Sequence, residues 1–157
     1  MNKVNESPNR AATHRAVPFD RLANLGMEVE EAAGGDTLHM EALLKLAAEQ
    51  GKPASHYVAA SVLSADIQLE HTHAVALVFC AGVCQQWGAL ECIDHAVESW
   101  EKRRDAKLPL FDIQGRKCLD RCADAAVLEV RSPSGTAVIT AATPEKIDLA
   151  LEALLSQ

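Results

Sequence analysis

The stretch AVALVFCAGVC, residues 74–84, decides the fold of this chain of 157 residues. Its first six residues are all apolar, and a short uninterrupted apolar run is typical of a strand that is buried on both faces. The run ends at Cys80, and a loop that contains a glycine leads to Cys84. From about Gln85 to Arg104 apolar residues recur at helical spacing, which predicts a helix directly after the loop.

The chain that follows this helix predicts three more strands and a closing helix. A short strand is expected at residues 110–113, and we expect Gly115 to break it. Strands at 127–130 and 137–140 should form a hairpin, because Ser, Pro and Gly lie between them. The last helix is expected to begin near Thr143, with a proline at its first position. The order strand, helix, strand, loop, strand, strand, helix predicts an α/β protein with a thioredoxin-like fold.

Two regions precede this unit. Residues 1–36 are mostly polar and cannot bury enough apolar surface to offset the entropy of ordering, so we expect a flexible N-terminal extension. Residues 37–66 predict an N-terminal helical hairpin, with helices at 37–50 and 54–63 separated by Gly-Lys-Pro. Such a hairpin is too small for a core of its own. It should therefore dock on the domain that follows, residues 73–157.

Composition and charge exclude several classes of function. The formal net charge of −7, without a face rich in Lys and Arg, argues against a nucleic-acid partner. The longest apolar stretch, residues 74–82, is far shorter than the ~20 residues needed to cross a bilayer, so direct membrane insertion is not expected. The N-terminus lacks the apolar segment of a secretory signal, which predicts a cytoplasmic protein. Since no Gly-rich nucleotide motif is present, any flavin or nicotinamide chemistry would belong to a partner chain.

Four of the five cysteines form two equally spaced pairs, Cys80-x3-Cys84 and Cys118-x3-Cys122. In a reducing compartment, paired cysteines are more often metal ligands or catalytic thiols than structural disulfides. Two thiolate pairs that a fold brings face to face are what a metal ion or an iron–sulfur cluster requires. The fifth cysteine, Cys92, lies inside the predicted helix, and we interpret it as an ordinary half-buried core residue.

The two cysteine loops resemble those of the thioredoxin-like 2Fe–2S ferredoxins. This family includes the small iron–sulfur subunit of NADH:quinone oxidoreductase and the gamma subunit of NAD-dependent formate dehydrogenases. The matching segments are VFCAGVCQQWGA, residues 78–89, and CLDRCADAAV, residues 118–127, and the resemblance covers about residues 40–155. It implies one-electron transfer, with a flavin- and NAD-binding oxidoreductase subunit as the partner. The ligands of the 2Fe–2S cluster would be Cys80, Cys84, Cys118 and Cys122.

Three features depart from the loops of that family. Its first loop usually has four residues between the cysteines, and this chain has three. Asp120 stands where the family usually has Gly, and Ala125-Ala126 where it has Gly-Pro. Two alternatives therefore stay open, a cluster-free structural or regulatory subunit with the same fold, and a zinc or thiol-redox protein. A homo-oligomer is also compatible with the sequence.

Overall fold

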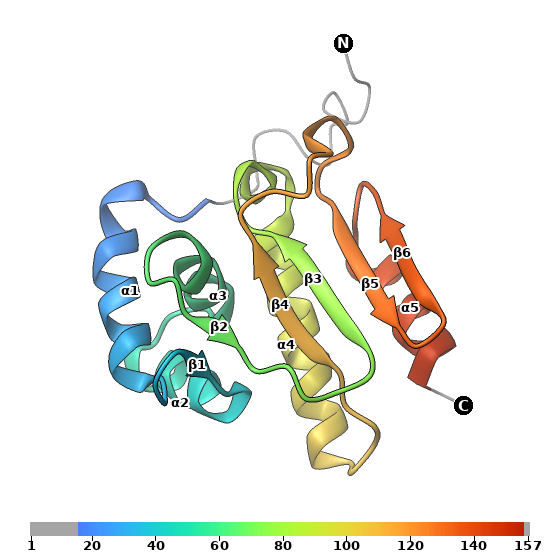
Figure 1. The fold of residues 1–157 in the computed structure, drawn as a ribbon, viewed down its shortest axis with the longest axis horizontal. Coiled ribbons are helices and arrows are strands. Elements are labelled where there is room, and N and C mark those ends of the chain that lie inside the picture. The colour runs from blue at the N-terminus through green and yellow to red at the C-terminus, as the bar shows by residue number, and fades with distance from the viewer. Residues whose placement is uncertain (1–15, 156–157) are drawn as a thin grey trace.

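A four-stranded sheet forms the centre of the fold (Figure 1). The computed structural model describes residues 16–155, without the side chains of Val83 and Cys122. In chain order its elements are α1 (Phe19–Ala32), β1 (Thr37–Leu38), α2 (Met40–Gln50), α3 (Ala54–Leu63), β2 (Gln68–Leu69), β3 (Ala76–Cys80), the 3-10 helix η1 (Val83–Trp87), α4 (Ala89–Asp105), β4 (Asp112–Arg116), the 3-10 helix η2 (Cys122–Asp124), β5 (Leu128–Ser132), β6 (Gly135–Ile139) and α5 (Pro144–Leu155). The expectation of a mixed α/β protein is confirmed.

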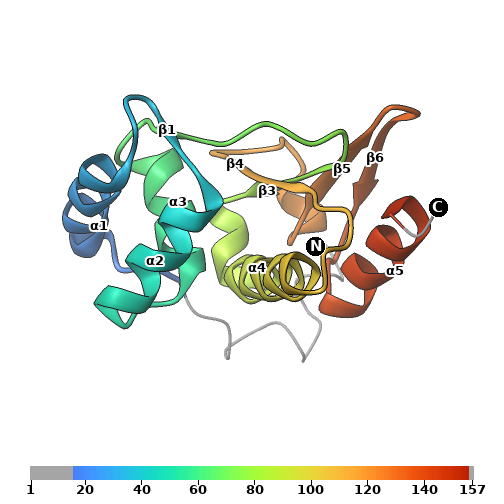
Figure 2. The same cartoon turned by 90° about the horizontal axis from the view of Figure 1, so that it is seen from below.

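The sheet has the strand order β4-β3-β5-β6. β3 pairs in parallel with β4 and antiparallel with β5, and β5 and β6 form an antiparallel hairpin. Helices α4 and α5 lie against one face, and no helix covers the other face in Figure 2. Every residue of β3 is buried, as the apolar run predicts, and Leu77 and Phe79 belong to the main hydrophobic core.

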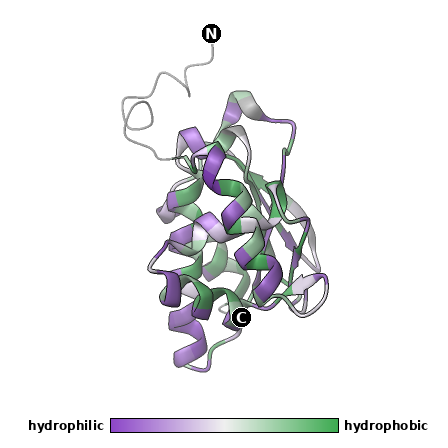
Figure 3. Cartoon of the chain, turned by 90° about the vertical axis from the view of Figure 1, so that its left-hand side faces the viewer, coloured by the Kyte–Doolittle hydropathy of each residue, from purple (hydrophilic) through white to green (hydrophobic). Residues whose placement is uncertain are grey.

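Helices α1, α2 and α3 form a second layer beside β4, on the left of Figure 1. α3 contacts α1 on one side and both α4 and β4 on the other, so it is buried along most of its length, including Tyr57 and Val58. The carboxylate of Asp94 on α4 accepts hydrogen bonds from the Ser55 N–H at 2.9 Å and from the Ser55 hydroxyl at 2.8 Å. Figure 3 shows this side of the protein, where hydrophilic segments lie toward the outside of the helices. The hairpin of α2 and α3 therefore docks on the following domain, as expected.

The structure corrects the prediction for residues 1–36. Residues 1–15 lie outside the described part of the chain, but residues 19–32 form α1 and are not a flexible extension. Leu25 and Val29 are one helical turn apart and fully buried, so this short apolar stripe gains its stability from packing on α3. The next helix begins at Met40 and not at Thr37, because Thr37–Leu38 forms strand β1, which pairs with β2.

The elements of the second half follow the prediction with shifted bounds. The helix expected from Gln85 is divided into η1 and α4 at Gly88, which has a φ of 97° that few other residues adopt. The hairpin of β5 and β6 is confirmed. Thr143 precedes α5, and its hydroxyl accepts a hydrogen bond from the Lys146 N–H at 3.3 Å, as a helix cap does. Among residues 16–155 no helix is both long and apolar enough to cross a membrane.

The sequence predicted that Gly115 would end the strand. In the structure Gly115 lies inside β4. A Cβ atom at this position would lie 2.5 Å from Cγ2 of Val62 on α3. The absence of a side chain is therefore what allows α3 to approach the strand closely.

We expect Gly115→Ala to lower the free energy of unfolding by about 1–3 kcal/mol, because the added methyl group overpacks the contact with Val62. Combining it with Val62→Ala should recover part of that loss, since the second change removes the clashing methyl groups. Urea denaturation of the two single variants and the double variant measures this coupling. Strictly additive effects would contradict the proposed contact.

Candidate functional site

The first cysteine loop joins the end of β3 to η1. Cys80 is the last residue of β3 and Cys84 lies in η1, and their exposed fractions are only 2% and 1%. Both side chains are reduced thiols. The loop turns tightly because Ala81 and Gly82 are followed at once by a 3-10 turn, in which the Gln85 N–H donates to the Gly82 carbonyl at 3.0 Å.

Hydrogen bonds converge on the Cys80 sulfur. A hydrogen bond from the Cys84 side chain is the main reason that the pKa of the Cys80 thiol is lowered from 9.0 to about 5. Burial opposes this change, because it disfavours the charged sulfur. Backbone N–H groups of Gly82, Cys84 and Leu119 lower the pKa further. The fold thus builds an environment that stabilises a thiolate at Cys80 at neutral pH.

The second cysteine loop leaves the end of β4, and it is more open than the first. Cys118 is exposed, and its Sγ accepts a hydrogen bond from the Asp120 N–H at 3.2 Å. Asp120 has a φ of 58°, a left-handed conformation that Asp adopts more readily than most residues. Asp120 can therefore provide the turn at a position where the resembling family uses Gly.

The two loops meet at one end of the sheet. β3 and β4 are adjacent and parallel, with Cys80 opposite Arg116 in the register. Both loops therefore begin at the carboxyl ends of the strands, at the same end of the sheet. The Ala81 N–H donates to the Arg116 carbonyl at 2.8 Å, and Cys80 Sγ lies 3.7 Å from the Lys117 carbonyl oxygen. A Cβ atom on Gly82 would lie 2.5 Å from that same oxygen. Only glycine at position 82 therefore lets the first loop lie this close to the Lys117 carbonyl oxygen of the second loop.

The predicted ligand cysteines lie in the two loops that meet at this end of the sheet. Cys80 and Cys84 share a hydrogen bond, and the Leu119 N–H next to Cys118 reaches Cys80 from the second loop. The side chain of Cys122 lies outside the described part of the structure, although its backbone begins η2 in the second loop. Among the side chains that the structure describes, no three His, Cys, Asp or Glu residues are grouped closely enough to hold a metal ion.

Cys92 occupies a different environment. It is buried in α4, and its Sγ lies 3.5 Å from the carbonyl oxygen of Ala142, just before α5. The interpretation of Cys92 as a core residue is confirmed, although its side chain is almost fully buried and not half-buried as expected.

Gln85 supports the first loop, although the sequence analysis did not single it out. Its side chain is buried. The amide nitrogen donates a hydrogen bond to the Ala81 carbonyl at 2.5 Å, and the amide oxygen accepts one from the Val17 N–H at 2.8 Å. It thereby ties the segment that precedes α1 to the backbone next to Cys80. The sequence signals this role only by a glutamine five residues after the buried strand, because both of its partners are backbone groups.

Comparisons with known proteins do not name a family: no family model matches the chain, and neither does any curated protein.

We expect Cys84→Ala to raise the pKa of Cys80 from about 5 toward the ordinary thiol value, because it removes the main hydrogen bond to the thiolate. The Cβ chemical shift of Cys80, followed against pH in reduced metal-free protein, reports this pKa. Cys92→Ala is the matched control, since Cys92 contacts Ala142 instead, and it should leave the titration of Cys80 unchanged. An unchanged titration in Cys84→Ala would contradict the assigned hydrogen bond.

Proposed function

We propose that the protein transfers single electrons through a 2Fe–2S cluster, as a small subunit or partner of a larger NAD-linked oxidoreductase. The observation that carries this proposal is the meeting of the two cysteine loops at one end of the sheet, where Cys80 Sγ lies 3.7 Å from the Lys117 carbonyl. Loops that meet in this way can direct thiolates toward one cluster. The cluster would supply the one-electron chemistry when bound.

The topology supports the thioredoxin-like part of the proposal. β3 and β4 form a parallel pair joined through α4, and an antiparallel hairpin closed by α5 completes the sheet. The sheet order β4-β3-β5-β6, with β3 between its parallel and antiparallel neighbours, is the arrangement expected of that fold.

The residues present suit a cluster in their chemistry. Cys80, Cys84, Cys118 and Cys122 would be the ligands, two from each loop. N–H groups already point at two of these sulfurs, those of Gly82, Cys84 and Leu119 at Cys80 and that of Asp120 at Cys118. Such hydrogen bonds stabilise negative charge on sulfur and tune the reduction potential of a cluster. The exposed Cys118 loop would be the side from which an electron reaches a partner.

Iron and acid-labile sulfide measured after anaerobic purification test the proposal. We expect about two of each per chain, together with visible absorbance and an electron paramagnetic resonance signal after reduction. Serine substitutions of Cys80, Cys84, Cys118 and Cys122 should each lower the iron content. Cys92→Ser is the control and should retain it, since Cys92 lies against Ala142. Protein without iron, or loss of iron in Cys92→Ser with none in Cys84→Ser, would contradict the ligand set.

A second candidate function is thiol–disulfide exchange without a cluster. It is favoured by the hydrogen bond between the Cys84 and Cys80 side chains and by the lowered pKa of Cys80, which are properties of a reactive dithiol. The Cys80 and Cys84 thiols would be oxidised to one disulfide. The disulfide substrate would accept the two electrons and two protons that they release. Iron-free protein that forms a reversible Cys80–Cys84 disulfide with oxidised glutathione would support this function over the first.

The proposed partner is a flavin- and NAD-binding subunit, and the N-terminal helices are its proposed docking element. α3 belongs to the core, since Tyr57 and Val58 are fully buried, so α1 offers the surface for docking. Phe19 and Met27 on α1 expose 89% and 60% of their area.

We expect Phe19→Ser combined with Met27→Ser to reduce co-purification with such a subunit, because it removes apolar surface available for burial. The iron content of the variant should stay unchanged, since neither residue lies in the cysteine loops. Leu149→Ser on α5, which is also an exposed apolar position, is the matched control. Unchanged assembly in the α1 variant would contradict docking through α1.

A further inference from the structure

A cavity of about 630 Å³ lies at the end of the sheet opposite the cysteine loops. It adjoins the start of β3, whereas Cys80 ends that strand. Three other segments complete its lining, namely residues 109–110 before β4, the turn between β5 and β6, and the last turn of α5. In Figure 1 these segments lie around the lower end of the sheet. The volume falls within the range of about 300–1,000 Å³ that is typical of small-molecule sites.

Apolar side chains form most of the lining. Those of Leu110, Leu154 and Leu155 pack against the hydrophobic core on one side and stay half-buried, so part of each is left to the cavity. Among residues 16–155, no Asp, Glu, Lys or Arg side chain contributes to the lining. The cavity therefore suits a ligand that has an apolar body and no net charge, since a charged group would lose its hydration there without a charged partner.

His73 also lines the cavity, and the fold holds its ring in place. Its Nδ1 lies 2.8 Å from Oδ1 of Asp112, and its backbone N–H donates to Oδ2 of the same carboxylate at 3.0 Å. Asp112 is only 1% exposed, and it also accepts the Thr72 N–H at 2.9 Å. A buried carboxylate thus fixes both the backbone and the ring of His73, so this polar group is positioned before any ligand arrives.

The same carboxylate determines which ring nitrogen of His73 is left for a ligand. Because an ionised carboxylate only accepts hydrogen bonds, the ring proton of neutral His73 lies on Nδ1. Nε2 is then an acceptor, and no group among residues 16–155 donates to it.

The two serine hydroxyls in the lining also direct their protons away from a ligand. The Ser132 hydroxyl donates to the Gly135 carbonyl at 3.4 Å, which leaves it to accept from the Ser134 hydroxyl at 2.9 Å. The polar groups of the cavity therefore offer acceptors, and a ligand that binds them must supply the proton.

We propose that this cavity binds a small neutral phenol that carries an apolar substituent. The phenolic O–H donates to Nε2 of His73, and the ring and its substituent lie against the three half-buried leucines of the lining. A phenol matches the site better than an aliphatic alcohol, because its hydroxyl is more acidic and so a stronger donor to imidazole. A carboxylate is a poorer match, because no cationic Lys or Arg lines the cavity.

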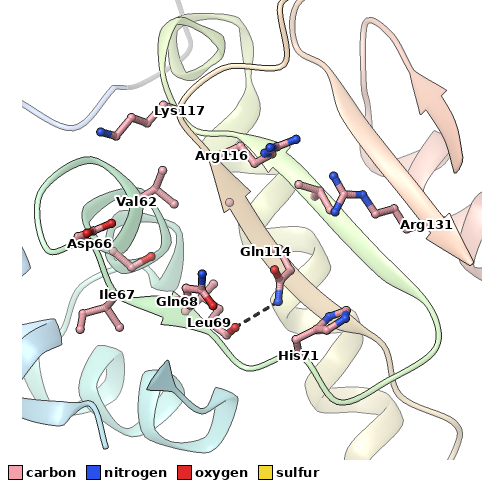
Figure 4. A pocket seen from close by; sticks show the side chains of 13 residues that line it. Val62, Asp66, Ile67, Gln68, Leu69, His71, Gln114, Arg116, Lys117 and Arg131 are labelled. Carbon is pink, nitrogen blue, oxygen red and sulfur yellow. Dashed lines mark hydrogen bonds between the residues drawn. The ribbon is translucent and has the colours of Figure 1, made fainter. Parts of the chain in front are cut away.

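His71 provides a comparison within the same chain, because it shares the carboxylate of Asp112 but not the cavity. Its Nδ1 lies 3.2 Å from Oδ2 of Asp112. Its side chain lines a separate groove beside β4, together with Leu69 and Gln114 (Figure 4). Binding in the cavity should therefore depend on His73 and not on His71. The proposal is also independent of the cluster, because no cysteine contributes to the lining.

Titration of the full chain with two probes, followed by nuclear magnetic resonance, tests the proposal. 4-Ethylphenol has the hydroxyl proton, and 4-ethylanisole has the same ring and oxygen with a methyl group in place of that proton. We expect 4-ethylphenol to bind about fivefold to tenfold more tightly, since only it can donate to Nε2 of His73. The amide signals of Val75, Leu110 and Leu154 should move with it. Absence of binding at millimolar concentration, equal affinity of the two probes, or shifts confined to other parts of the chain would overturn the proposal.

His73→Phe should weaken 4-ethylphenol binding by about fivefold to tenfold, because it removes the acceptor and keeps a ring at this position. Its backbone N–H remains available to Asp112. His71→Phe is the matched control, since it removes the other imidazole from the same carboxylate, and it should leave binding unchanged. Equal weakening in both variants, or none in His73→Phe, would overturn the proposal. If His73→Phe does not fold, the comparison of the two probes on the unaltered chain decides. The iron content does not enter any of these outcomes.

Discussion

The close approach of Gly82 to the Lys117 carbonyl is the contact on which the candidate site depends. A side chain at position 82 would place an atom 2.5 Å from that oxygen, so a larger residue would force the two cysteine loops apart. The parallel pairing of β3 with β4 brings the two loops together, because the carboxyl ends of both strands lie at one end of the sheet. The backbone N–H of Leu119 can then reach the Cys80 sulfur, to which it donates from the opposite loop. The environment of the Cys80 sulfur therefore depends on a backbone contact as much as on the neighbouring thiol.

Contacts between the helices and the sheet support that arrangement. Gly115 lets α3 lie close to β4, and Asp94 binds the first turn of α3 from α4. Gln85 joins the backbone of the first loop to Val17. Because these residues connect separate elements, the N-terminal helices form part of the structure that holds the loops in position. This explains why α1 is ordered although its sequence carries only a narrow apolar stripe.

Local patterns in the sequence predicted the elements that local forces determine. The apolar run of β3, the bounds of α3 and the turn between β5 and β6 each have a signal within a few neighbouring residues. The helix α1 and the continuation of β4 through Gly115 were not predicted, because they depend on packing against α3. For the candidate site, the sequence predicted which cysteines flank the two loops. It could not predict the N–H groups around Cys80 or the left-handed turn at Asp120, because these follow from backbone geometry that only the assembled loops define.

The central claim is that the two loops hold one cluster between them. X-ray absorption at the iron edge, measured on protein purified without oxygen, tests this claim most directly. We predict about four sulfur neighbours around each iron atom and a second iron atom at short distance. A first shell of nitrogen or oxygen atoms, or protein without bound iron, would contradict it.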